Sequence, residues 1–347
     1  MKTPRSPQKS WFKKNLPLLG VALLVPAAII GVVEIYQKIL NAIRPPFHSN
    51  LIEVPDVPNM TVRYGGSTSF APLGKGNEMS QKIQQFHPGF KLTYTKPLNG
   101  KNPGSSIGIS MLLNDSLDFA LASRSLETEE YDDAKGKRFS LEQKKVAYDG
   151  IAFYVNRNLH LANYPNIPLP GLTISKLKGI LTGEITNWKD VGGTDLPIVI
   201  FSRNPKSGGT PQYVQENVME KKKFAPSVRF EENTTQSIRL VAETPGGIGY
   251  ATASEVCNQD SIGSLPIVRD EKQEFVSPCT KDQSTNDVNI TVFDNGTYPI
   301  TRPMFVIIKR DNGFSEKAGI AYVNLLLSKE GQKIIKRAGL APVHGER

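Results

Sequence analysis

Three consecutive hydroxyl side chains, Ser67, Thr68 and Ser69, follow a Gly-Gly pair in the stretch TVRYGGSTSF. A strand that ends in glycines and leads into a helix directs several free backbone N–H groups at one point, and the helix dipole adds partial positive charge there. Such a turn binds anions without any lysine or arginine, and hydroxyl groups add further donors. The alternative is that Ser67 or Thr68 only caps a helix. This turn taken alone leaves both interpretations open.

The same combination of small and hydroxyl residues occurs in three later turns. In NPGSSIGISMLL, Ser105 and Ser106 open an apolar helical segment, and in DFALASRSL a strand ends at Ser123 and Arg124. Arginine offers a planar set of N–H donors that suits an oxyanion. Together the turns predict an anion site whose donors are chiefly neutral. The last turn, in IVIFSRNPKSGGTPQYVQENV, contains Arg203, Ser207, Gly208, Gly209 and Thr210.

None of these turns has the spacing of a nucleotide or catalytic site. The sequence contains neither GxxxxGK[ST] nor a GxGxxG after a predicted strand, which disfavours nucleotide and dinucleotide cofactors. The match to GxSxG, at 104–108, follows a Pro-Gly turn, whereas a hydrolase nucleophile follows a strand. The histidines have no carboxylate pattern beside them, and no metal-ligand spacing is present. No catalytic residue, metal ligand or cofactor is predicted.

The positive charge of the chain is concentrated at its N-terminus. The formal net charge is +9, and residues 1–50 carry +6 of it, from seven basic side chains and one acid, Glu34. The rest of the chain shows no stripe of Lys and Arg with interleaved aromatic residues. No nucleic-acid partner is therefore predicted.

An uncharged run of 18 residues, Leu16 to Val33, follows Lys13 and Lys14. Its length is near the minimum for crossing a bilayer, and the lysines before it keep that side cytoplasmic. We therefore expect a cytoplasmic basic tail at 1–15 and an uncleaved transmembrane anchor at 16–36, with everything after it exported. A cleaved signal segment, which would release the chain into the periplasm, is the alternative.

The exported part has the pattern of an α/β fold. Residues 37–59 contain four prolines and predict a stiff tether, and short apolar runs alternate with helical patterns from residue 60 onward. Strands are expected at 61–64, 91–94, 118–122, 146–155, 197–202, 247–251 and 302–309, and helices at 78–86, 106–113, 127–135, 173–182, 210–220, 234–243 and 315–338.

Cys257 and Cys279 lie 22 positions apart, without a histidine or cysteine pair nearby that would indicate a metal site. In an oxidising compartment this spacing favours a local disulfide. Two unrelated free thiols are the alternative.

The set of motifs resembles the periplasmic phosphate-binding proteins of bacterial ABC importers over nearly the whole span from 60 to 340, and most of all their cyanobacterial, membrane-anchored or exported relatives. The resemblance implies a two-lobed α/β periplasmic-binding-protein fold of type II-like topology, with two hinge crossings, preceded here by one N-terminal transmembrane helix. Lobe one is expected at 60–148 and 250–347, with both cysteines on one of its connections, and lobe two at 149–249. The motifs that carry the resemblance are GGSTSFAPL, GSSIGISMLLNDSLDFALASR, GILTGEITNWKDVGG, TPGGIGYATASEV, YPITRPMFVIIK and the loop from Arg203 to Thr210.

Carried over by position, the resemblance assigns phosphate contacts to the four turns. Thr68 and Ser69 match the first phosphate-holding turn and Ser105 the second. Arg203, Ser207 and Gly208 match the third. The full predicted site comprises Ser67, Thr68, Ser69, Ser105, Ser106, Ser123, Arg124, Asp149, Arg203, Ser207, Gly208, Gly209 and Thr210.

Two departures from the family pattern affect selectivity. Many members have an aspartate where this chain has Ser123, and that aspartate accepts the proton of hydrogen phosphate. Gly209 replaces a usual hydroxyl residue, with Thr210 one position later, and Pro205 replaces an acidic or polar residue. We expect Asp149, in VAYDGIAFYVN, to act as the substitute proton acceptor where the chain crosses the hinge. The alternative is that Asp149 only caps a turn with Gly150.

The resemblance implies a phosphate receptor held at the cell membrane by a single span, with its folded part in the periplasm. Its expected partners are inorganic phosphate and the permease of an ABC importer. A membrane-anchored module that senses phosphate or regulates another protein is one alternative. A receptor for another tetrahedral oxyanion, sulfate or molybdate, is the other.

Overall fold

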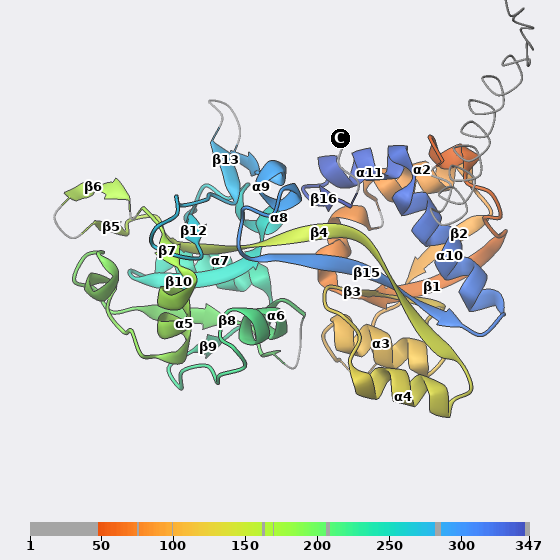
Figure 1. The fold of residues 1–347 in the computed structure, drawn as a ribbon, viewed down its shortest axis with the longest axis horizontal. Coiled ribbons are helices and arrows are strands. Elements are labelled where there is room, and N and C mark those ends of the chain that lie inside the picture. Colours follow the sequence, from red (N-terminus) through yellow and green to blue (C-terminus); the bar gives the residue numbers. More distant parts are fainter. Residues whose placement is uncertain are drawn as a thin grey trace, which may run out of the picture. The chain divides into compact units, whose positions relative to one another are not determined.

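A 17-residue strand, β4 (Ser140–Asn156), runs through the centre of the fold and contributes to both of its lobes (Figure 1). The computed structural model of the chain describes residues 48–74, 76–98, 100–161, 164–168, 170–205, 209–281 and 286–343. The first part of β4 pairs with β15 (Thr301–Arg310), and its second part pairs with β10 (Gly247–Thr252), both antiparallel. One continuous strand therefore joins two cores.

Lobe one is a sheet covered by helices on both faces (Figure 1). One core lies under α2 (Glu78–Phe86), α10 (Phe314–Leu327) and α11 (Lys329–Arg337), and the other lies under α3 (Ser105–Leu113) and α4 (Thr128–Gly136). Besides β15, the first part of β4 and these helices, the lobe contains β1 (Met60–Gly66), β2 (Phe90–Tyr94), β3 (Phe119–Ala122) and β16 (Ala341–Pro342), with η1 (Leu51–Glu53) and η2 (Thr68–Leu73).

Lobe two is built on the second part of β4 and on β10, around a separate core. It contains β5 (His160–Leu161), β6 (Tyr164–Pro168), β7 (Leu172–Thr173), β8 (Val199–Ser202), β9 (Arg229–Phe230), β11 (Ile262–Ser264), β12 (Ile267–Val268), β13 (Cys279–Lys281) and β14 (Asn286–Val288), with α5 (Ile174–Thr182), η3 (Trp188–Val191), α6 (Gly209–Asn217), α7 (Thr234–Glu243), α8 (Ala253–Val256) and α9 (Ile290–Asp294).

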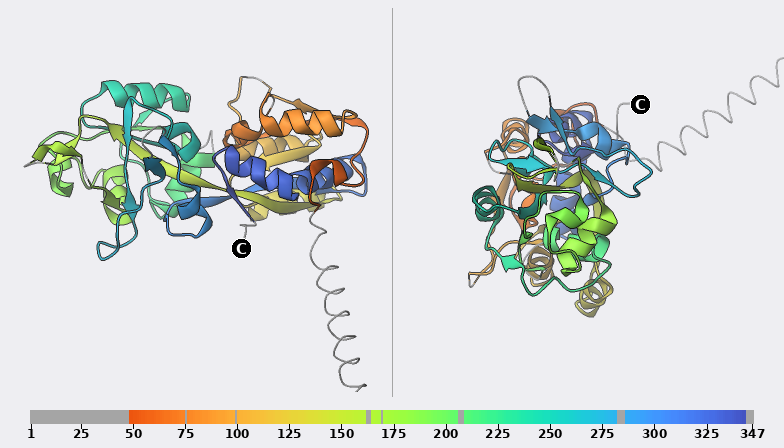
Figure 2. Two further views of the ribbon diagram at one scale, coloured as in Figure 1. Left: turned by 90° about the horizontal axis from the view of Figure 1, so that it is seen from above. Right: turned by 90° about the vertical axis from the view of Figure 1, so that its left-hand side faces the viewer.

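The main sheet extends through both lobes with the order β2-β1-β3-β15-β4-β10-β8-β9, in which β11 and β16 also pair with β4. The other strands pair separately, β5 with β6, β7 with β12 and β13 with β14. The chain passes from one lobe to the other along β4 and again at the start of β15. In β4, Val146 and Ala147 lie in a lobe-one core and Ile151 lies in the lobe-two core. At β15 the change of core falls between Ile300, which directly precedes the strand, and Met304 within it. The expected two hinge crossings are therefore present, and Figure 2 shows these strands linking the lobes.

Two of the sequence motifs are joined by a buried tryptophan. Trp188, from LTGEITNW, is fully buried and donates its indole N–H to the carbonyl oxygen of Gly246, from PGGIGY, at 2.9 Å. Gly246 has a φ of +73°, and a side chain there would collide with the carbonyl oxygen of Pro197, so glycine is required. The first of these motifs includes the end of α5, which is capped by Gly183 with a left-handed φ of 83°. The residues of these two motifs therefore stabilise the fold of lobe two.

The expected elements are largely present, with one helix divided. The helix predicted at 315–338 is two helices, α10 and α11, separated at Ser328. The hydroxyl of Ser328 accepts a hydrogen bond from the backbone N–H of Gly331 at 2.9 Å and so caps α11. An N-cap residue has non-helical backbone, which interrupts the helical path.

The expected return of the chain to lobe one at residue 250 is placed too early. Strand β11 pairs with the second part of β4, and β12 pairs with β7, so the chain from 250 to about 300 stays in lobe two. Residues Ala253, Ile262 and Phe293 belong to the lobe-two core. Because β15 is the second crossing, lobe one resumes only there.

Part of the predicted tether is packed against lobe one. Leu51 and Val54 are buried in its core, and the N–H of Leu51 donates to Glu330 at 2.9 Å. Within the described ranges, no helix has both the length and the apolar character that a membrane crossing requires. The anchor predicted at 16–36 and its basic tail lie outside those ranges.

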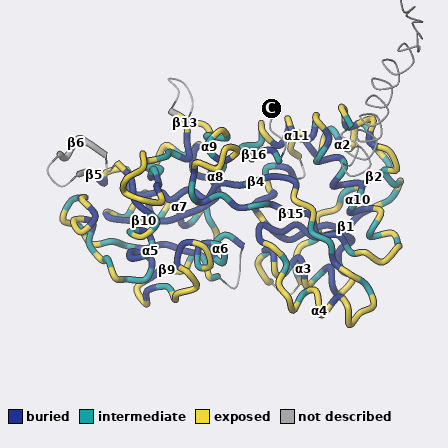
Figure 3. Tube along the Cα trace, viewed as in Figure 1, coloured by how far each residue is buried: buried dark blue, intermediate teal, exposed yellow. Residues whose placement is uncertain are grey.

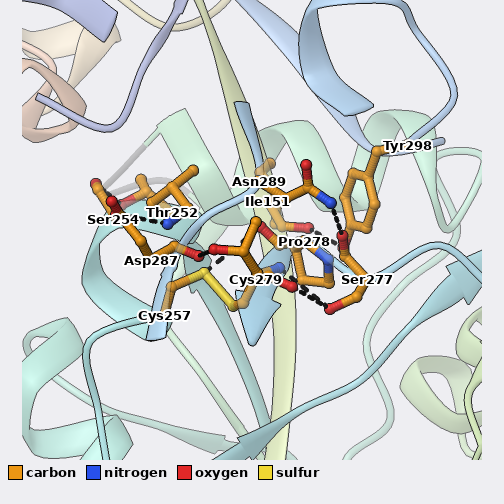
Figure 4. The surroundings of a disulfide bond; sticks show 12 residues. Ile151, Thr252, Ser254, Cys257, Ser277, Pro278, Cys279, Asp287, Asn289 and Tyr298 are labelled. Atoms are coloured by element: carbon orange, nitrogen blue, oxygen red, sulfur yellow. Dashed lines mark hydrogen bonds between the residues drawn. A yellow bond between two sulfur atoms is a disulfide. The ribbon is translucent and has the colours of Figure 1, made fainter. Parts of the chain in front are cut away.

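The predicted disulfide joins Cys257 and Cys279, with 5.4 Å between their Cα atoms (Figure 4). Both cysteines lie in the lobe-two core, so the expected place on a lobe-one connection is wrong. Cys257 follows α8 and Cys279 begins β13, so the bond fastens a short helix to the β13–β14 hairpin. Figure 3 shows buried residues along the central strands β4, β15 and β10.

Reduction of this disulfide should destabilise the protein. The bond closes a loop with a sequence separation of 22, which corresponds to about 3 kcal/mol of unfolding free energy in the chain-entropy model. Thermal unfolding with and without a reductant measures the effect. A double variant with Cys257→Ala and Cys279→Ala is the control, because its melting temperature should not respond to the reductant. An equal response in both proteins would contradict the prediction.

Candidate functional site

Three buried serines from separate turns of lobe one meet at one point. The hydroxyl of Ser67 donates to that of Ser123 at 2.9 Å, and the hydroxyl of Ser105 lies 3.4 Å from the same oxygen. The backbone N–H of Ser123 donates to the Ser105 hydroxyl at 3.0 Å. Each of the three residues is at most 5 % exposed. Three of the predicted turns are therefore brought together.

The sheet explains why these turns converge. Strands β1 and β3 are parallel neighbours, so their C-terminal ends lie at one edge of the sheet, where Ser67 and Ser123 follow them. Helix α3 begins there with Ser105 and packs closely on β1. The approach is so close that a side chain at Gly108 would collide with the backbone of Gly66. Gly66 has a φ of +118°, which only glycine adopts readily. The Gly-Gly pair thus permits the approach of the helix.

Ser67 also has the capping role that was its alternative interpretation. Its hydroxyl accepts a hydrogen bond from the backbone N–H of Ser69 at 3.3 Å, as the N-cap of η2. The hydrogen bonds of the three clustered hydroxyls run to one another and to backbone N–H groups. The one hydrogen of the Ser67 hydroxyl is used within the cluster, so Ser105 and Ser123 are the candidate hydroxyl donors to a ligand. Among the described residues, the hydrogen bonds of these hydroxyls do not include one to a basic side chain, which activation of a serine nucleophile requires.

Lobe two closes on this cluster through the first residues of α6. A Cβ atom placed on Gly209 would lie 2.5 Å from the Ser123 hydroxyl and 2.7 Å from the Ser105 hydroxyl. The backbone of Gly209 is therefore in direct contact with both serines. Helix α6 also reaches lobe one through the side chain of Gln212, which donates to Glu127 at 2.9 Å. The N-termini of α3 and α6 thus converge, one from each lobe, and both favour negative charge.

A buried ion pair lies beneath the cluster, at the hinge. Asp149 on β4 and Arg302 on β15 are opposite each other in the strand pairing, and both side chains are fully buried. Oδ2 of Asp149 accepts from Nε of Arg302 at 3.0 Å and from Nη2 at 2.7 Å. Nη2 also donates to Ser69 of lobe one at 2.6 Å and to Thr210 of lobe two at 2.9 Å.

The position of Asp149 at the hinge matches the expectation, and the turn interpretation is wrong. Asp149 and Gly150 both lie inside β4, paired with Arg302 and Thr301 of β15. Burial raises the pKa of Asp149 to about 6, because the attraction of Arg302 offsets only part of the cost of desolvation. Its second oxygen, Oδ1, is buried and has no hydrogen-bond partner among the described residues. An acceptor is therefore left unused at the hinge.

Arg203 and Arg124, the predicted arginine ligands, differ in how they are engaged. Burial lowers the pKa of Arg203, and the nearby charge of Arg302 acts in the same direction. Nε of Arg203 has no partner among the described residues. Arg124 instead donates to both carboxylate oxygens of Glu130, at 3.0 and 2.7 Å, and to the exposed Ser106 at 2.9 Å. Burial works against the charged form of Arg124, but Glu130 raises its pKa.

A cavity of about 250 Å³ opens beside the hydroxyl cluster and is lined in part by Thr68 and Ser69 of the first turn. Its lobe-two wall carries the carboxylates of Glu255 and Asp287, which disfavour an anion there. The opposite wall includes Arg337, which is already paired with Glu78. We therefore place the candidate anion site at the serine cluster and regard the cavity as its surroundings.

Two predicted residues, Ser207 and Gly208, lie outside the described part of the chain. Sequence reasoning missed Arg302, although an arginine within the apolar strand TRPMFVII is a signal that it is buried with a partner. No group of His, Cys, Asp and Glu among the described residues is arranged to hold a metal ion.

Comparison with known proteins gives consistent matches. A family model described as a PBP superfamily domain matches residues 58–330. The phosphate-binding protein PstS of Staphylococcus epidermidis is 26% identical over 272 residues, which cover 77% of this chain and 74% of that protein. PstS of Borreliella burgdorferi is 26% identical over 80% of this chain and 88% of its own length. A solved structure of a putative phosphate ABC transporter substrate-binding protein with bound phosphate, from Clostridium perfringens, has 27% identity and a TM-score of 0.64, covering 82% of this chain and 100% of that chain.

Substitution Gly209→Ala should hold the lobes apart. The added methyl group would overlap the hydroxyls of Ser105 and Ser123, and such overpacking costs about 1–3 kcal/mol. We expect a larger radius of gyration in small-angle scattering, because the closed form is disfavoured. Gly136→Ala is the matched control, since a methyl group at the end of α4 meets nothing within 4 Å. Scattering curves for Gly209→Ala and the parent that coincide would contradict this contact.

Proposed function

The chain belongs to the PBP superfamily, whose model matches residues 58–330, and on that premise we propose that it binds inorganic phosphate between its lobes as the substrate-binding component of an ABC importer. The matched relatives are named as phosphate-binding proteins, and one similar structure holds phosphate. Their names describe binding and transport, so binding is the proposed activity of this chain and catalysis is not.

The observation that carries the proposal is the convergence of small and hydroxyl turns from both lobes. Ser67, Ser105 and Ser123 meet at the edge of the lobe-one sheet, and Gly209 of lobe two packs directly on them. Two helix N-termini add backbone donors at the same place. A tetrahedral oxyanion has oxygens on every side, and a site assembled from two lobes surrounds it with donors when it closes.

We propose separate roles for the predicted residues. Ser69, Ser105 and Thr210 donate hydroxyl hydrogen bonds, with backbone N–H groups near Thr68 and Gly209. Ser67 donates its hydroxyl hydrogen to Ser123 and so holds the two turns together, and Ser123 completes the donor set. Arg203 supplies the charge-assisted bond, and Ser207 and Gly208 retain the contacts that the family pattern assigns to them. Ser106 and Arg124 brace the start of α3, because Glu130 engages the guanidinium.

Asp149 is the proposed source of selectivity for phosphate over sulfate. Hydrogen phosphate carries a proton that needs an acceptor, whereas sulfate carries none at neutral pH. Oδ1 of Asp149 is buried and has no partner among the described residues, which supports its use as that acceptor. A carboxylate at this place would accept a hydrogen bond from hydrogen phosphate and would repel sulfate, which has no proton to donate.

The proposed setting is the outer side of the cytoplasmic membrane. The uncharged run from Leu16 to Val33, which follows Lys13 and Lys14, supports an N-terminal anchor at 16–36, with the lobes exported. The disulfide supports an oxidising compartment. The importer permease is the proposed macromolecular partner. The alternative is a sensory role at the membrane, and measurement of phosphate transport distinguishes that role from delivery to an importer.

Titration calorimetry of the purified protein with phosphate tests the function, and Arg203→Ala tests the place of the site. Removal of a charge-assisted donor from a closed site should weaken phosphate binding by roughly 2–4 kcal/mol. Arg229→Ala is the control, because that residue lies on the exposed strand β9. Failure of the parent to bind phosphate would overturn the function, and equal binding by parent and Arg203→Ala would overturn the site.

Substitution Asp149→Asn should narrow the preference for phosphate over sulfate. Asparagine still offers Arg302 an acceptor oxygen, but it replaces the free oxygen with an NH₂ donor, which cannot accept the phosphate proton. In the parent, the preference should also decline as the pH falls through about 6, because Asp149 becomes protonated and loses its acceptor. Competition titrations with phosphate and sulfate from pH 7.5 to 5 measure both effects. A variant that rejects sulfate as strongly as the parent does would make Asp149 purely structural.

A further inference from the structure

Arg302 contacts lobe one, lobe two and the other hinge strand at the same time. It lies on the hinge strand β15, fully buried, opposite Asp149 of the other hinge strand. A single nitrogen, Nη2, is within hydrogen-bond distance of Ser69 in lobe one, Asp149 at the hinge and Thr210 in lobe two. One atom of this side chain therefore links all three regions.

The donors of this guanidinium are unevenly used. Nη1 and Nη2 each carry two hydrogens, and Nε carries one. Nη2 faces three acceptors, at 2.6, 2.7 and 2.9 Å, which is more than its hydrogens can serve. Nη1 is buried and has no acceptor among the described residues. A buried charged donor without a partner is costly, so the geometry calls for an acceptor at Nη1.

A second arginine, Arg203, indicates that the missing acceptor is negatively charged. Nε of Arg203, from lobe two, is also buried without a partner in the described part of the chain. Burial lowers the pKa of Arg203, the charge of Glu255 raises it, and the charge of Arg302 makes a smaller contribution that lowers it, so the two cations disfavour each other. Asp149 offsets one of them. An oxyanion that accepts from both guanidinium groups would satisfy their free donors and relieve the repulsion.

On the basis of the proposed function, we infer that Arg302 is a phosphate-binding residue that couples the ligand to lobe closure. Nη1 donates to the bound oxyanion, while Nη2 holds Thr210 of lobe two against Ser69 of lobe one. Asp149 orients the guanidinium for both tasks. Ligand binding and closure therefore depend on one side chain that belongs to the hinge.

Substitution Arg302→Lys tests this role while keeping a positive charge beside Asp149. Lysine is a single donor centre and cannot bridge the ligand and both lobes, so we expect calorimetry at pH 7.5 to show phosphate binding at least about 30-fold weaker. Arg310→Lys is the matched control, because Arg310 lies on the same strand and is exposed. It should bind phosphate like the parent.

A double variant, Arg302→Gln with Asp149→Asn, removes both charges together and leaves no unpaired buried ion. It should unfold cooperatively and bind phosphate more weakly than Asp149→Asn alone. Thr210→Val should weaken binding in the parent but add little in the Arg302→Lys background, because residues that act through one contact are not additive. Small-angle scattering with phosphate should show incomplete closure in each Arg302 variant.

The outcomes distinguish the role of Arg302 from the function itself. If the parent binds phosphate and Arg302→Lys binds it within about threefold, the proposed function stands and Arg302 is only structural. A lowered melting temperature with unchanged affinity also makes Arg302 only structural. If Arg302→Lys does not fold, equal affinity of the double variant and Asp149→Asn overturns the inference. If the parent binds no phosphate, both the function and the inference are wrong.

Discussion

The ion pair between Asp149 and Arg302 is the interaction on which the arrangement of the two lobes depends. Both side chains are fully buried, and they face each other across the two strands that join the lobes. A buried pair of this kind contributes little net stability, because desolvation opposes the attraction, but loss of one partner is strongly destabilising. Its value here is positional: it fixes the hinge strands in register and directs a guanidinium toward Ser69 and Thr210.

The serine cluster near that ion pair consists of uncharged side chains. The serine cluster supplies neutral donors, and neutral donors cost less to bury than charged ones when no ligand is present. Of the charges that do occur, Arg124 is paired with Glu130, Glu255 lies on the wall of the neighbouring cavity, and Arg203 is buried with an Nε that has no partner among the described residues. Gly209 then lets the backbone of lobe two approach the serines without a side chain between them.

The disulfide and the cavity belong to the same part of lobe two. Cys257 and Cys279 join the segment after α8 to the β13–β14 hairpin. Ser254 and Asp287 surround that bond in Figure 4 and also line the cavity. The disulfide therefore fixes a wall next to the candidate site, rather than a remote connection. Small elements such as α8 have little core of their own, so a covalent link is an effective way to hold them.

The sequence by itself determined the local elements and the chemistry of the turns. Periodicity located most strands and helices, because burial of one face is a local pattern, and glycine beside serine identified the converging loops. It could not reveal the break at Ser328 or the course of the chain after residue 250, since a cap competes with helix continuation and strand β11 pairs far away in sequence. The membership of Ser67, Ser105 and Ser123 in one cluster, and the contacts of Arg302 with both lobes, were decided only by tertiary structure. Hydrogen bonds such as Arg302 to Ser69 join residues 233 positions apart, and no local pattern encodes a contact that arises when sheet order and lobe closure bring distant turns together.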